Sequence, residues 1–109
     1  MSTRAYEMMI IVDSDEDDAM VDDVVSRVET WLTEGGSRLA STEKWGKRKF
    51  AYEINHKTEG HYVVVEMVTE PRDMEPLERT LRLADEIVRH KLIRLPDHEA
   101  ARRGLLEVG

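Results

Sequence analysis

Cationic side chains gather in one stretch of this chain, at residues 44–54, which read KWGKRKFAYEI. Lys44, Lys47, Arg48 and Lys49 lie there, although the formal net charge of the chain is -7. Such a cluster can attract nucleic-acid phosphates even in an acidic protein, because the Debye length is only ~8–10 Å at physiological salt. Cations of this kind also occur on exposed edge strands, where they prevent sheets from associating. The residues alone leave both roles open.

A run of acids at residues 13–18, DSDEDD, has the composition of a calcium-binding loop but lacks its pattern. An EF-hand loop that begins at Asp13 requires glycine at its sixth position and glutamate at its twelfth. Those positions hold Asp18 and Val24. We therefore expect the acids to cap a helix and to complement the positive end of its dipole.

Motifs for catalysis or cofactor binding do not occur in the sequence. Four histidines are present, without the spacing of zinc ligands, and there is no cysteine. No glycine-rich phosphate loop or nucleophile elbow is found, and no serine has a neighbouring base. The sequence therefore predicts a protein that is not an enzyme, with no metal, no cofactor and no small-molecule substrate.

The length of 109 residues fits one domain. No stretch approaches the ~20 apolar residues of a membrane span, and the N-terminal apolar run is too short for a signal peptide. We therefore expect a cytosolic protein without membrane association. We assign residues 1–96 to the domain and residues 97–109 to a C-terminal tail, either mobile or folded as a short helix.

Hydrophobic periodicity divides the chain into two helices and four strands. We expect strands at residues 4–12, 38–54, 61–68 and 87–95 and helices at 16–34 and 74–84, with residues 55–60 as a turn. A break in the alternation between Ile87 and Leu92 indicates a bulge. The order βαββαβ is ferredoxin-like. It predicts an α+β fold: a four-stranded antiparallel sheet with both helices on one face and the first and third strands at its centre.

The two faces of this sheet have different predicted roles. We place Phe50 in the core between sheet and helices, together with Met8, Ile10, Val25, Leu32, Val65, Met67, Leu77 and Leu81. The central strands are apolar on their other face as well, through Met9, Ile11, Tyr62 and Val64. An apolar patch of this kind is either a partner-protein site or is covered by another part of the chain.

The second option is that the tail folds back over this patch through Leu105, Leu106 and Val108. We favour the partner protein, and we expect Val64→Asp to leave the chain folded. RNA recognition motifs share the βαββαβ order but stack bases on several aromatics of the central strands. The third strand offers only Tyr62 here, so any contact with RNA is expected to be electrostatic.

The basic stretch also carries a family resemblance. Residues 46–55, GKRKFAYEIN, resemble the second-strand signature of the bacterial small-subunit ribosomal protein number six family. Tyr6-Glu7 resembles the start of its first strand, residues 60–67 its third strand, and residues 83–89 the exit from its second helix. Phe50 stands where leucine is usual in that family, and Lys91 where an apolar residue is common.

This resemblance implies the ferredoxin-like fold and a structural, non-catalytic role at the cytoplasmic ribosome. It implies binding to small-subunit (16S) ribosomal RNA together with small-subunit ribosomal protein number eighteen, which becomes the candidate partner for the apolar patch. With the resemblance, we assign RNA contact to Arg4, Lys44, Lys47, Arg48, Lys49, Arg89 and Arg94. The competing hypothesis is a dimeric ferredoxin-like regulatory module that senses a small molecule.

Overall fold

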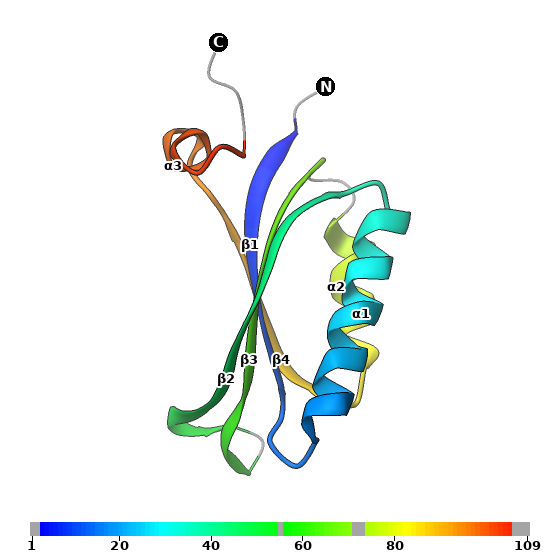
Figure 1. The fold of residues 1–109 in the computed structure, drawn as a ribbon, viewed down its shortest axis with the longest axis vertical. Helices are drawn as coiled ribbons and strands as arrows, with labels where there is room; N and C mark the ends of the chain where they lie inside the picture. Colours follow the sequence, from blue (N-terminus) through cyan, green and yellow to red (C-terminus); the bar gives the residue numbers. More distant parts are fainter. Residues whose placement is uncertain (1–2, 55, 71–73, 106–109) are drawn as a thin grey trace.

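The computed structural model describes residues 3–54, 56–70 and 74–105. These residues form a four-stranded sheet and three helices (Figure 1). In chain order the elements are β1 (Arg4–Asp13), α1 (Asp18–Glu34), β2 (Arg38–Ile54), β3 (Lys57–Thr69), α2 (Met74–Leu83), β4 (Ile87–Arg94) and α3 (Asp97–Arg102).

The sheet is antiparallel, with the strand order β2-β3-β1-β4. Helices α1 and α2 cover one face of it, whereas α3 lies on the opposite side, near the upper end of the view in Figure 1. The predicted ferredoxin-like fold and the central position of β1 and β3 are confirmed. We call the side of the sheet away from α1 and α2 the open face.

Helix α1 begins where the acidic run ends. The side chain of Asp17 caps the helix by accepting a hydrogen bond from the backbone N–H of Met20 at 2.9 Å. Four apolar residues at helical spacing face the sheet and are buried, and Gly35 follows the last turn. The buried residues of α1 are Val21, Val24, Val28 and Leu32.

The main core lies between the sheet and these two helices. Alternate residues of β1 and β3 point into it, because successive side chains of a strand face opposite sides. Its buried members are Tyr6, Met8, Ile10, Val12, Val21, Val24, Val28, Leu32, Val63, Val65, Met67, Leu77 and Leu81, with Val25, Leu39, Ile87 and Leu92 among the partly buried residues packed against them.

The prediction that Phe50 belongs to this core is wrong. Strand β2 has two extra residues, Ala40 and Trp45. The pairing with β3 skips from Leu39 to Ser41, and Lys44 pairs with Val63 while Gly46 pairs with the adjacent Tyr62. Each bulge reverses which side chains face each side of the sheet. Lys44 therefore faces α1, whereas Phe50 lies on the open face, where its ring centroid is 6.1 Å from that of Tyr62.

The predicted boundary between the second and third strands changes, whereas the predicted bulge in the last strand is present. The β2–β3 connection is shorter than residues 55–60, because β3 begins at Lys57 and Ile54 already pairs with it. The predicted bulge in the last strand is confirmed: Ile11 of β1 pairs with Arg89 and the next residue, Val12, pairs with Ile87. Val88 is the extra residue between them.

The segment after residue 96 forms α3 and packs on the open face. Ala100 and Leu105 join Ala5 of β1, Val68 of β3 and Leu95 in a second, smaller apolar cluster. Leu106 and Val108, which we expected to help cover this face, lie outside the described residues. The tail thus covers one end of the open face, and the division of the chain at residue 96 stays a prediction.

Candidate nucleic-acid and partner interfaces

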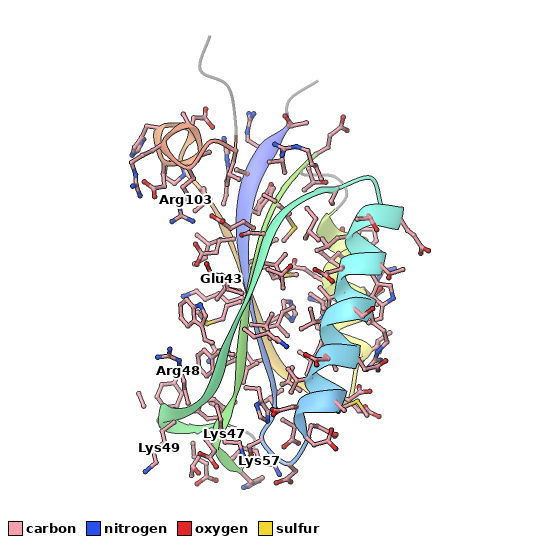
Figure 2. All side chains as sticks on the ribbon, viewed as in Figure 1. Glu43, Lys47, Arg48, Lys49, Lys57 and Arg103 are labelled. Carbon is pink, nitrogen blue, oxygen red and sulfur yellow. The ribbon has the colours of Figure 1, made fainter. Side chains whose placement is uncertain are left out.

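Three cations of the basic stretch lie at the free end of the β2–β3 hairpin. Lys47, Arg48 and Lys49, which we call the tip cations, are exposed and pair in the ladder with residues 59–61 of β3. The guanidinium of Arg48 lies 5.3 Å from the centre of the Trp45 ring, a cation–π contact. Figure 2 shows the tip cations at the end of the molecule opposite Arg103. Within the described part of the chain, no carboxylate forms an ion pair with them.

Other cations near the hairpin are neutralised within the chain. Lys44 pairs with Asp22 of α1, and this hydrogen bond raises the pKa of Lys44 above its ordinary value. Lys57 pairs with Asp15 and lies 3.5 Å from Asp13, and its hydrogen bond to Asp15 lowers the pKa of that carboxyl. Acids before α1 therefore hold Lys57 and cap the helix, and an acid within α1 holds Lys44.

The remaining predicted RNA-contacting arginines do not lie together. Arg89 pairs with Ile11 and faces the open side, where it donates to the hydroxyl of Tyr52 at 3.4 Å. Arg4 and Arg94 share the helix-covered side of the sheet with Tyr6, at the opposite end of β1. Arg4 and the hairpin end of β1 are about 30 Å apart, because a strand rises ~3.4 Å per residue.

The predicted apolar patch does lie on the open face. Met9 pairs with Val64 across β1 and β3, and Ile11 pairs with Tyr62. However, Ile11 and Val64 are only 6% and 7% exposed, whereas Met9 and Tyr62 are half-buried. Our expectation that Val64→Asp leaves the chain folded conflicts with this burial, since an unpaired carboxylate would be desolvated there.

The curled end of β2 covers part of this patch and leaves a hollow beside it. A β-carbon on Gly60 would lie 2.5 Å from the side chain of Ile11 and 3.0 Å from the ring of Phe50, so only glycine allows this close approach. The hollow has a volume of about 270 Å³. It is lined by Met9, Ile11, Phe50, Ala51, Tyr52, Ile54, Tyr62, Arg89, His90 and Lys91.

Acidic side chains occupy the other half of the open face, beside α3. Arg103 donates to Glu7 at 3.0 Å and to Glu66 at 2.8 Å, and it also pairs with Glu99 at 2.8 Å. Hydrogen bonds from Ser41 and then Arg103 lower the pKa of Glu66. Those from Arg102 and Arg103 lower the pKa of Glu99 to about 2.

Sequence reasoning did not find Phe50, Ala51, Tyr52 and Ile54 as residues of the open face. The signal that points to them is a pair of glycines. Gly46 has a φ of 85°, a left-handed conformation that marks the bulge, and Gly60 faces the ring of Phe50. Among the described residues, no group of three or more histidine, aspartate or glutamate side chains is placed to hold a metal ion. No described helix is long and apolar enough to cross a bilayer.

Comparisons with known proteins agree with one another. A model of the family described as ribosomal protein S6 matches residues 5–94. The small ribosomal subunit protein bS6 of Carboxydothermus hydrogenoformans is 35% identical over 91 residues, covering 84% of this chain and 95% of that protein. The protein of the same name from Micrococcus luteus is 38% identical, covering 84% of this chain and 90% of its own length. The chain belongs to the ribosomal protein S6 family.

The crystal structure of 30S ribosomal protein S6 from Thermotoga maritima has the same fold. Its TM-score with this chain is 0.86 at 31% sequence identity, over 94% of this chain and 97% of that one. Membership of the ribosomal protein S6 family makes the chain a structural component of the small ribosomal subunit and not an enzyme, as predicted. It also assigns the chain to the cytoplasmic ribosome, and it decides against the small-molecule sensor.

Proposed function

We propose that this chain binds 16S ribosomal RNA through the hairpin tip and small-subunit ribosomal protein number eighteen through the open face. The observation that carries the proposal is the difference in charge pairing. No carboxylate of the described residues forms an ion pair with the tip cations, although the charge of Lys47 contributes to the lowered pKa of Asp15. Lys44 and Lys57, by contrast, each form an ion pair with an aspartate. Free cations at an exposed tip are available to phosphates.

Lys47, Arg48 and Lys49 form the centre of the proposed RNA contact. Arg89, which was also predicted to contact RNA, lies instead on the open face that we propose for the partner protein. Arg4 and Arg94 would touch RNA only as a separate contact at the far end of the sheet, and Lys44 would first have to leave Asp22. Helix α1 covers the side of the sheet opposite the open face (Figure 1). Lys47 pairs with His61 on that helix-covered side, and its charge contributes to the lowered pKa of Asp15.

The proposed partner contact is the apolar half of the open face. Met9 and Tyr62 present the exposed part of the predicted patch, and Ile11 and Val64 form its buried floor. Tyr52, which is 66% exposed, extends the apolar surface beside it. Aromatic and methionine side chains are enriched at the centres of protein interfaces, which supports a protein partner here.

Salt-dependent binding to a 16S fragment tests the RNA contact. Lys47→Glu combined with Lys49→Glu is expected to weaken binding and to lower the slope of log K against log salt by about two units, roughly one for each phosphate that is no longer neutralised. Arg79→Glu with Arg82→Glu on α2 makes the same change in net charge and is the control. Equal reductions in affinity for the two double variants would show that only net charge matters and would remove the tip from the proposal.

Methyl NMR with the purified partner tests the protein contact. The methyl groups of Met9, Ile11 and Val64 are expected to shift when small-subunit ribosomal protein number eighteen is added. Met8, Ile10 and Val65 alternate with them on the same strands but face the helices, so they serve as internal controls. Shifts confined to the control methyls, or a partner that does not bind, would contradict the proposed pairing.

A further inference from the structure

The hollow on the open face combines apolar walls with cations at one side. Met9, Ile11 and Ile54 are aliphatic, and the rings of Phe50, Tyr52 and Tyr62 complete the apolar part. Arg89 and Lys91 come from β4, the edge strand, and are exposed. An apolar concavity with a few convergent polar groups is the usual form of a binding site for one anchoring group.

The cations of β4 give the hollow a charge preference. Arg89 has only the long hydrogen bond to Tyr52, and no carboxylate forms an ion pair with Arg89 or Lys91 in the part of the chain that the structure describes. Ladder pairing places them on the open face beside Ile11 and Met9, respectively. A group that fills the hollow would therefore have its charged end next to two cations.

The geometry of the rings favours a protein side chain over a nucleobase. Base recognition on a sheet of this topology uses aromatic faces on the central strands. In this chain β1 contributes Met9 and Ile11, which have no ring, and the Tyr62 ring is tilted by 47° against Phe50. The free space is lined by aliphatic groups and by rings that are not parallel to each other, which suit a single apolar side chain.

We infer that the hollow receives one anchoring side chain of the partner protein, an aromatic or large aliphatic residue directly beside a carboxylate that pairs with Arg89 and Lys91. This inference rests on the proposed pairing, because it names the chemistry of the segment that docks on the open face. It also gives Tyr52 a role: its exposed ring closes the hollow and its hydroxyl orients Arg89.

Phenylacetate reproduces this chemistry as a probe, and benzyl alcohol is its uncharged counterpart. NMR titration of the full chain is expected to place phenylacetate in the hollow with a dissociation constant of about 1–10 mM, as is usual for so few atoms. Arg89→Gln with Lys91→Gln should weaken phenylacetate about fivefold without affecting benzyl alcohol. Tyr52→Ala should weaken both compounds through the missing ring, and phenylacetate more strongly, because Arg89 also loses its hydrogen bond to the Tyr52 hydroxyl. Arg79→Gln with Arg82→Gln on α2 is the charge-matched control and should change neither.

Three results would overturn the inference. Phenylacetate could bind no more tightly than benzyl alcohol, or the β4 double variant could bind phenylacetate as well as the control variant. Uridine monophosphate could also bind the hollow more tightly than phenylacetate, which would assign the site to RNA.

The partner itself separates this inference from the proposed function. If small-subunit ribosomal protein number eighteen binds the β4 double variant with unchanged affinity, the pairing stands and the carboxylate anchor fails. If it does not bind the unmodified chain, the pairing fails, and the phenylacetate titration alone decides the chemistry of the hollow.

Discussion

The two faces of strands β1 and β3 differ in what covers them, although their residues alternate along the same backbone. Met8 and Val65 face the helices and are fully buried in a core that α1 and α2 complete. Met9 and Tyr62 face the other way and remain half-buried, because only the curled end of β2 and the small helix α3 lie on that side. Stability is thus concentrated on one face, and the other face is available for partners.

Truncation on the helix-covered face should have the largest effect on stability. Leu81 of α2 is 0% exposed, so Leu81→Ala is expected to lower the free energy of unfolding by about 2–5 kcal/mol through reduced burial and a cavity. Leu83 of the same helix is 77% exposed, and Leu83→Ala should stay within about 0.5 kcal/mol. Urea denaturation measures the free energy of unfolding of both variants. Equal destabilisation by the two substitutions would contradict the assignment of Leu81 as buried and Leu83 as exposed.

A methyl group at Gly60 tests the close packing under the hairpin. Gly60→Ala places its β-carbon against Ile11 and Phe50, and overpacking of this kind costs about 1–3 kcal/mol. Thermal unfolding measures the destabilisation. A variant as stable as the unmodified chain would mean that Phe50 does not lie over this glycine.

Phe50→Ala measures how much a side chain of the open face contributes to stability, for comparison with Leu81 in the core. Because Phe50 is half-buried, its truncation is expected to cost about 1–2 kcal/mol, less than the truncation of Leu81. The methyl signals of Ile11 should shift, whereas those of Val65 in the main core should not. A destabilisation above about 3 kcal/mol would show that Phe50 is buried in the core between the sheet and the helices.

Acid should release α3 from the open face before it affects the main core. Glu66 of β3 accepts a hydrogen bond from Arg103, and its pKa is lowered by Ser41 and Arg103, so its contribution to docking is complete above its ordinary value of 4.5. The pairs of Glu99 with Arg102 and Arg103 lie within the α3 segment. The contribution of Glu66 to docking is lost as pH falls below 4.5 through its lowered folded-state pKa. Amide exchange at Ala100 and Leu105 should accelerate in this range while exchange in α1 does not. Arg103→Gln should reduce this pH dependence, because it removes the hydrogen bond from Arg103 to Glu66.

Much of the fold follows from local patterns. The valines of α1 have helical spacing, Gly35 and Gly36 end that helix, and the irregular spacing after Ile87 marks the β4 bulge, so these elements could be predicted. The face of each residue in β2 depends on two bulges. The extra residue at Ala40 reverses the alternation of β2 and the extra residue at Trp45 restores it, so Phe50 lies on the side opposite Leu39, as unbroken alternation would place it. Residues between the two bulges, such as Lys44, lie on the side that unbroken alternation does not give.

Some features of the candidate sites could likewise be predicted from the sequence, and others could not. The cross-strand neighbours Met9 and Val64 were predictable, because the order of strands fixes which central residues are adjacent. The neutralisation of Lys44 by Asp22 was not, since it depends on which side of β2 faces α1. Docking of α3 also depends on long-range pairs, such as Arg103 with Glu7, that have no local signature.

The central claim is that RNA and the partner protein use different regions of this chain, and one paired titration tests it. Affinities for a 16S fragment and for small-subunit ribosomal protein number eighteen are measured separately, each with two variants. The variants are Lys47→Glu with Lys49→Glu at the tip and Met9→Glu on the open face, where Lys91 is the cross-strand neighbour of the new carboxylate. We expect the tip variant to bind RNA at least tenfold more weakly, about 1.4 kcal/mol, with unchanged affinity for the partner protein. We expect Met9→Glu to bind the partner protein at least tenfold more weakly, with unchanged affinity for RNA. A parallel reduction of both affinities in either variant, with unfolding unchanged, would contradict the account.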